Sequence, residues 1–89
     1  MTIRTIRITN EKGLHARASA KLVEVVEAHD ATAEISKDGL NASGDSIMGL
    51  LMLAAAKGST IELRTEGPEA EKLAEALEAL VADRFGENL

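Results

Sequence analysis

One histidine stands beside charges that are arranged the wrong way round for a helix. His15 comes directly before a segment whose apolar periodicity predicts a helix over 16–28. Arg17 and Lys21 lie in its early turns, although the helix dipole favours acidic residues there. Histidine is also not a preferred residue at the position that caps a helix start. Two local rules broken at one place indicate a functional site.

The chemistry that these residues could perform is the binding and transfer of a phosphate-like anion. Unpaired backbone N–H groups at a helix start bind such anions, and a neighbouring Arg adds charge-assisted hydrogen bonds. We therefore expect the backbone of Ala16 and Arg17 to hold the anion, with His15 as the nucleophile. Positive surroundings disfavour a protonated ring and leave it a lone pair. From spacing alone, a surface histidine beside a chance arrangement of charges remains an open alternative.

Hydrophobic periodicity predicts the elements that must position this site. Strands are expected over 2–9, 31–37, 40–42 and 60–65. Helices are expected over 16–28, 46–56 and 69–84. Strands with one apolar face and amphipathic helices can bury their apolar surfaces against each other when the helices cover one face of a single sheet. The predicted fold is an α+β two-layer sandwich in the order β-α-β-β-α-β-α, forming a single domain over 1–89.

Composition excludes several classes of function. The 89-residue chain carries a formal charge of −5, which argues against binding to nucleic acid or to anionic membranes. The absence of Cys removes disulfide and thiol chemistry. No apolar run approaches the ~18 residues of a membrane span. We expect a cytoplasmic protein that needs neither a metal nor a cofactor.

Two segments resemble a known family. Residues 10–17 read NEKGLHAR, which closely resembles the phosphorylation-site signature of HPr, the histidine-containing phosphocarrier of the bacterial phosphotransferase system. Residues 45–51 read DSIMGLL, which is similar to the second characteristic segment of that family. The resemblance covers the whole chain and implies an open-faced, four-stranded antiparallel sheet with three helices on one face. One departure is Ala18, where the family usually has Pro.

The resemblance implies a stoichiometric carrier rather than an enzyme. His15 would take a phosphoryl group on Nδ1 from phospho-enzyme I and pass it to a histidine of an enzyme IIA. Phosphoryl transfer needs positioning and charge stabilisation more than covalent machinery, and Arg17 with the helix amides would supply part of both. The carrier is expected to be a monomer. The sequence leaves open whether it serves sugar uptake or a regulatory, nitrogen-related branch.

The second segment raises two further expectations. Ser46 either caps the helix over 46–56 or follows a capping Asp45 into its first turn. In some branches of the family the matching serine is phosphorylated by an HPr kinase/phosphorylase, which makes Ser46 a candidate regulatory site. The resemblance also assigns partner docking to four apolar residues. These are Ala20, Ile47, Met48 and Leu51.

Other classes of protein are weaker alternatives. Residues 45–47 also look like the phosphopantetheine attachment site of an acyl carrier protein, but the predicted strands argue against that all-helical class. A purely regulatory binding module would carry the same site. A small hydrolase using His15 and Ser46 lacks a nucleophile elbow. We interpret His29 as a structural residue at the end of the first helix.

Overall fold

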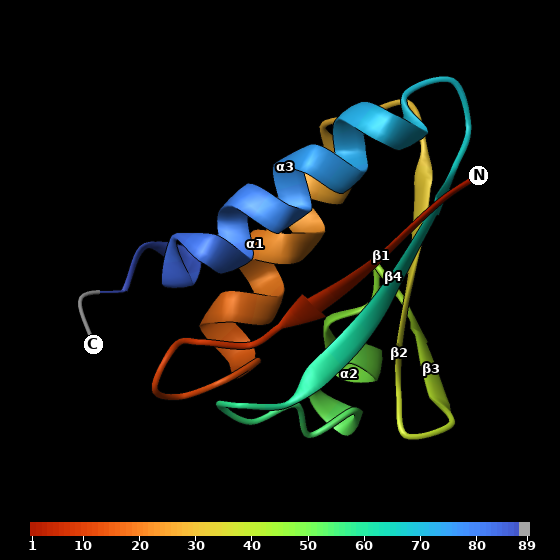
Figure 1. The fold of residues 1–89 in the computed structure, drawn as a ribbon. Coiled ribbons are helices and arrows are strands. Elements are labelled where there is room, and N and C mark those ends of the chain that lie inside the picture. Colours follow the sequence, from red (N-terminus) through yellow and green to blue (C-terminus); the bar gives the residue numbers. More distant parts are fainter. Residues whose placement is uncertain (88–89) are drawn as a thin grey trace.

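The computed structural model of the chain describes residues 1–87, in which one sheet is covered on one face by helices (Figure 1). The elements are β1 (Thr2–Arg7), α1 (Ala16–Glu27), β2 (Thr32–Lys37), β3 (Leu40–Ser43), α2 (Ile47–Met52), β4 (Thr60–Glu66), α3 (Ala70–Ala82) and a 3₁₀ turn η1 (Arg84–Gly86). Their order confirms the predicted sandwich. Among residues 1–87, no helix combines the length and the apolar character that crossing a membrane requires.

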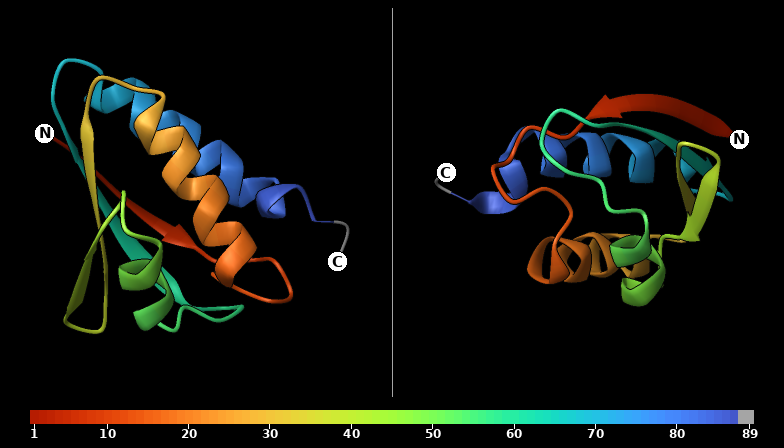
Figure 2. Two further views of the ribbon diagram at one scale, coloured as in Figure 1. Left: turned by 180° about the vertical axis from the view of Figure 1, so that it is seen from behind. Right: turned by 90° about the horizontal axis from the view of Figure 1, so that it is seen from below.

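The sheet is antiparallel throughout, in the order β1-β4-β2-β3. Central strand β4 alternates buried Ile61, Leu63 and Thr65 with exposed residues, because successive side chains of a strand point to opposite faces. Its buried face meets the helices, which the views in Figure 2 place on the same side of the sheet. The four strands of residues 1–87 rule out the all-helical acyl carrier class.

Helices α1 and α3 run side by side over the sheet (Figure 2). Each presents one apolar stripe to the core, with Leu22 of α1 and Leu77 of α3 both 1% exposed. Full burial of such a leucine contributes about 1.5–3 kcal/mol relative to exposure. This packing fixes the start of α1, and therefore His15, relative to the sheet. His29 is structural, as expected, because its Nδ1 bonds the Val25 carbonyl at 2.7 Å.

The prediction of a helix over 46–56 was wrong in length, because α2 ends at Met52. Leu53 is the C-cap, and Ala54 takes a left-handed backbone conformation with φ of +53°. The turn buries Leu53 and Ala55, which are 2% and 3% exposed. The Ala55 carbonyl then accepts a 2.8 Å hydrogen bond from Leu14 N–H, next to His15. Tertiary packing therefore overrides the helix propensity of the alanine run.

The helix predicted over 69–84 ends two residues early, at Ala82. Arg84 and Phe85 both have φ of +54°, so the chain turns sharply instead of continuing the helix. The Phe85 ring is buried in the core at 1% exposure. Arg84 consequently lies beyond the last turn of α3, just as Lys57 lies beyond α2. The other predicted bounds agree with the structure to within two residues.

Candidate functional site

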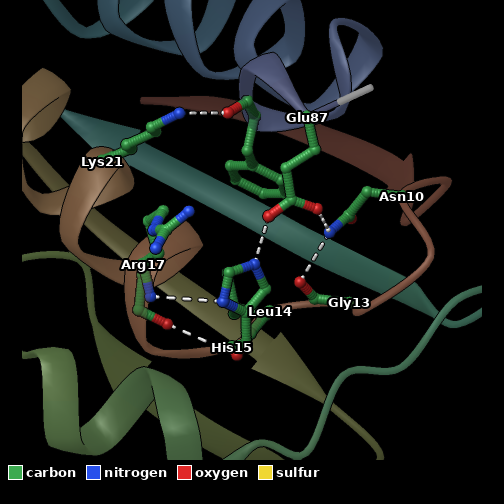
Figure 3. A network of polar contacts seen from close by, with 9 residues as sticks. Asn10, Gly13, Leu14, His15, Arg17, Lys21 and Glu87 are labelled. Atoms are coloured by element: carbon green, nitrogen blue, oxygen red, sulfur yellow. Dashed lines mark hydrogen bonds and ion pairs between the residues drawn. The ribbon is translucent and has the colours of Figure 1, made fainter. Parts of the chain in front are cut away.

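His15 is the residue that caps the start of α1 (Figure 3). Its backbone is extended, and ring atom Nδ1 accepts a hydrogen bond from Arg17 N–H at 3.3 Å. His15 therefore acts as the cap, although histidine is not a preferred residue at this position. A ring nitrogen supplies the acceptor that a Ser or Asp oxygen usually supplies to the unpaired amides of a helix start. An accepting Nδ1 bears a lone pair, as a nucleophile must.

The other ring nitrogen of His15 faces a carboxylate that was not anticipated from the sequence. Nε2 is hydrogen-bonded to Oε2 of Glu87, which follows the turn after α3 (Figure 3). Because Nδ1 accepts, a neutral ring carries its hydrogen on Nε2 and donates it to this carboxylate. We had expected positive surroundings for the ring. The structure corrects this, because the carboxylate of Glu87 also lies beside it. The surroundings combine an acidic group at Nε2 with a helix start at Nδ1.

Asn10 ties the same carboxylate to the loop that precedes α1. The Asn10 side chain is fully buried, and its Nδ2 donates to the Gly13 carbonyl at 2.8 Å and to Glu87 Oε1 at 3.0 Å. The hydrogen bond from Asn10, and then the one from His15, hold the pKa of Glu87 below its ordinary value of 4.5. The positive charge of Lys12 acts in the same direction. Glu87 is therefore an anion at neutral pH.

The ring opens onto a surface hollow of about 580 Å³. Its lining combines three cationic side chains with one carboxylate and comprises Lys12, His15, Ala16, Arg17, Lys21, Gly86 and Glu87. Lys21 Nζ donates to the Phe85 carbonyl at 2.5 Å. The exposed Arg17 guanidinium forms no hydrogen bond within residues 1–87, so its donors are available to an anion. The helix start also leaves the Ala16 N–H without an acceptor inside α1.

The structure of residues 45–51 shows which residue, Ser46 or Asp45, caps the start of α2. Ser46 caps α2, and its Oγ accepts a hydrogen bond from Gly49 N–H at 3.1 Å. The Asp45 carboxylate instead accepts from the Ser43 hydroxyl at 2.5 Å. The capping alternative is therefore the correct one. Ser46 is half-buried and lies outside the hollow beside His15.

The four residues assigned to docking differ in exposure. Met48 is 70% exposed and Ile47 39%, whereas Leu51 and Ala20 are half-buried. Ala20 belongs to α1, which packs against α2. Met52 was not anticipated, although it is 75% exposed and stands four residues after Met48 on the same side of α2. That spacing was visible in the sequence, but Met52 was not among the four residues that the resemblance assigned to docking.

Comparison with known proteins gives consistent results. A family model described as "PTS HPr component phosphorylation site" matches residues 3–83. Phosphocarrier protein HPr of Cupriavidus necator is 46% identical over 87 residues, covering 98% of both chains. Phosphocarrier protein NPr of Escherichia coli is 40% identical over 90 residues, covering 99% of this chain and all of that one. A crystal structure of HPr-C-His from Thermoanaerobacter tengcongensis matches the whole chain with a TM-score of 0.95 and 35% identity.

These relatives share the fold and nearly the full length of the chain, and both HPr and NPr carriers are among them. The segment that first indicated phosphate chemistry lies within the matched residues 3–83. The chain therefore belongs to the HPr family of phosphocarrier proteins of the phosphotransferase system.

Proposed function

We propose that this protein carries a phosphoryl group on Nδ1 of His15, accepted from phospho-enzyme I and passed to a histidine of an enzyme IIA. The observation that carries this proposal is the pairing of the ring, with Nδ1 at the start of α1 and Nε2 on Glu87. A ring in this state already has its lone pair at Nδ1. A phosphorus–nitrogen bond can form there without prior removal of a proton.

The transfer step balances without a further reactant. The bond between phosphorus and the donor's nitrogen breaks as the bond to Nδ1 forms, and the ring becomes a cation that keeps its hydrogen on Nε2. The negative phosphoryl oxygens face the amides of Ala16 and Arg17 and the Arg17 guanidinium. The Arg17 N–H that bonds Nδ1 at 3.3 Å is then free to donate to a phosphoryl oxygen.

The shape of the site supports a carrier rather than a catalyst. The ring is 26% exposed and lies beside an open hollow, so a bound phosphoryl group stays accessible to the next protein. A partner can supply the remaining charge stabilisation during each transfer. In this proposal the protein acts as a cytoplasmic monomer without a cofactor. The docking surface comprises the exposed Ile47, Met48 and Met52 and the half-buried Leu51 of α2, with Ala20 of α1 beside it.

The test is incubation with phosphoenolpyruvate and enzyme I, followed by addition of candidate enzyme IIA proteins. The proposal expects an acid-labile phosphoryl group on the wild type and none on His15→Ala. Normal phosphorylation of His15→Ala would contradict it. Transfer to a sugar-specific or to a nitrogen-related enzyme IIA then assigns the branch. Refusal of all candidates, despite loading by enzyme I, would contradict the second half of the proposal.

We also infer that Ser46 is a site of regulatory phosphorylation by an ATP-dependent HPr kinase/phosphorylase. The Ser46 hydroxyl is half-buried at the start of α2, directly before the exposed Ile47 and Met48. A phosphate there would place negative charge on an apolar docking surface and weaken binding of partners. Mass spectrometry after incubation with the kinase tests this, with Ser46→Ala as the control. An unmodified wild-type protein would refute the inference and leave the role of His15 untouched.

A further inference from the structure

We propose that Glu87 is a positioning residue that fixes the tautomer and orientation of the His15 ring. Its carboxylate accepts the hydrogen on Nε2 and so keeps the lone pair on Nδ1, where the phosphoryl group arrives. The inference deepens the proposed function and rests on it for its biological meaning. Its structural claim, that Glu87 selects one tautomer, stands without any phosphoryl transfer.

The carboxylate of Glu87 is held at both oxygens. Oε2 accepts from His15 Nε2, and Oε1 accepts from Asn10 Nδ2 at 3.0 Å. Only 15% of the Glu87 side chain is exposed, compared with 26% of the His15 side chain. Asn10 is itself fixed, because it is fully buried and donates to the Gly13 carbonyl at 2.8 Å. Glu87 is therefore an anchored acceptor and not a loose surface side chain.

The backbone before Glu87 adopts an uncommon conformation that brings this residue to the ring. Arg84, Phe85 and Gly86 have φ of +54°, +54° and +76°, and the left-handed region is unfavourable for the first two. The buried Phe85 ring stabilises the turn from inside the core. The bond from Lys21 Nζ to the Phe85 carbonyl, at 2.5 Å, stabilises it from α1. Strained backbone of this kind persists where surrounding contacts impose it, and here it directs Glu87 toward His15.

Two contacts on opposite sides of the ring select the same tautomer. A neutral imidazole can carry its hydrogen on either nitrogen, and the partner of one nitrogen decides the state of the other. A carboxylate only accepts, so Glu87 requires the hydrogen on Nε2. Arg17 N–H only donates, so it requires a lone pair on Nδ1. Once Nδ1 is phosphorylated, the cationic ring still has its Nε2–H on the carboxylate, so Glu87 also stabilises the loaded state.

The first experiment reads the tautomer directly and uses no phosphoryl donor. We would record the ¹⁵N chemical shifts of the His15 ring in the full-length protein at alkaline pH, which favours the neutral form of an imidazole. The wild type is expected to show a hydrogen on Nε2 and a bare Nδ1. Glu87→Ala is expected to shift both nitrogens toward the average of two tautomers. The control is Glu75→Gln, because Glu75 is exposed on α3 and forms no hydrogen bond or ion pair within residues 1–87.

A second variant tests whether Glu87 acts through its hydrogen-bond acceptor oxygen or through its negative charge. Glu87→Gln keeps an oxygen that can accept from Nε2–H, but its amide group then opposes the amide of Asn10. We expect ring shifts between those of the wild type and of Glu87→Ala. Ring nitrogens that are identical in the wild type and Glu87→Ala would overturn the proposal. Amide spectra of each variant verify that the fold is intact.

The second experiment measures phosphorylation by enzyme I and phosphoenolpyruvate. Glu87→Ala is expected to lower the rate at saturating carrier about tenfold, by analogy with the loss caused by removing a carboxylate that orients a metal-bound histidine. The half-saturating concentration is expected to stay unchanged, because the exposed residues of α2 are untouched. A changed half-saturating concentration with a normal maximal rate would contradict a positioning role and indicate docking instead. Failure of the wild type itself to be phosphorylated would refute the proposed function and not the tautomer assignment.

Discussion

The buried Asn10 amide donates a 3.0 Å hydrogen bond to the Glu87 carboxylate across 77 positions of the sequence. This bond joins the loop before α1 to the segment after α3, and the His15 ring contacts the other oxygen of the same carboxylate (Figure 3). The His15 ring is therefore held by Arg17 at the start of α1 and by Glu87 after α3, and Asn10 of the preceding loop fixes Glu87.

Arg17→Ala is expected to slow phosphoryl acceptance about 10- to 100-fold while the fold is retained. The exposed guanidinium forms no hydrogen bond within residues 1–87, so its removal changes the free energy of unfolding by no more than about 0.5 kcal/mol. Loss of a charged hydrogen-bond donor beside the phosphoryl oxygens destabilises the transition state and so lowers the rate. Rapid-quench kinetics with enzyme I and urea unfolding measure the two effects. Arg17→Lys is the matched variant and is expected to recover only part of the rate, because lysine lacks the planar pair of donors.

Asn10→Ala is expected to lower the free energy of unfolding by about 1–3 kcal/mol, because Nδ2 loses a buried hydrogen bond to the Gly13 carbonyl and a partly buried one to Glu87. The loss is expected in the lower half of that range. Asn10 Oδ1 has no hydrogen-bond partner within residues 1–87, so its removal relieves one unsatisfied atom. The variant is also expected to bring the pKa of Glu87 closer to its ordinary value, because the largest cause of the lowering is removed. Urea unfolding and NMR titration of the Glu87 carboxyl group measure these effects, and an unaltered titration would contradict the link between the two residues.

The contribution of Glu87 to stability is expected to depend on pH with a defined sign. The folded protein holds the pKa of this carboxyl below its ordinary 4.5, through Asn10, His15 and Lys12. The unfolded chain therefore binds the proton first as pH falls, and folding is favoured by the ionised group. The stabilisation is complete above pH 4.5 and is lost as pH falls through the lower folded value. Urea unfolding of wild type and Glu87→Gln from neutral to acidic pH measures the difference, and a gap that widens below pH 4.5 would show the opposite sign.

Gly13→Ala is expected to destabilise the fold and to displace His15. Gly13 has φ of +64°, and an added Cβ would lie 2.4 Å from the Ala55 carbonyl oxygen, so the backbone has to move. Gly39→Ala is the matched control, since Gly39 has φ of +84° but no atom within 4 Å of an added Cβ. The control isolates backbone strain, of the order of 1 kcal/mol, from the clash. Equal melting temperatures for the two variants would show that the contact with Ala55 is unimportant.

Met48→Asp is expected to weaken recognition by enzyme I without altering the chemistry at His15. Met48 is 70% exposed, so the substitution removes little core packing, yet it introduces charge into the proposed docking surface. The half-saturating concentration is expected to rise about tenfold at an unchanged maximal rate. Glu34→Gln on the exposed face of the sheet provides a control for substitutions outside that surface. An unaffected half-saturating concentration for Met48→Asp would remove α2 from the docking surface.

The sequence predicted the sandwich and the position of His15 because both depend on local patterns. Alternation marked the strands, and misplaced charges with an unusual cap marked the start of α1. Glu87 could not be predicted, since it reaches His15 only through the turn at Arg84 and Phe85, and the pattern of α3 gives no signal for it. The length of α2 was also predicted wrongly. Leu53 and Ala55 favour a helix locally, but both are buried in the core, where contacts with distant segments end the helix.

The open hollow beside His15 has a consequence for the rate at which the proposed carrier could pass on its phosphoryl group. If one ring nitrogen serves both the donor and the acceptor protein, the two proteins must reach the same small area and exclude each other. The carrier then has to dissociate from one before it can engage the other. The overall rate of phosphoryl transfer then depends on the concentration of the carrier and on the dissociation rate of each complex. Very tight binding to either protein would lower that rate.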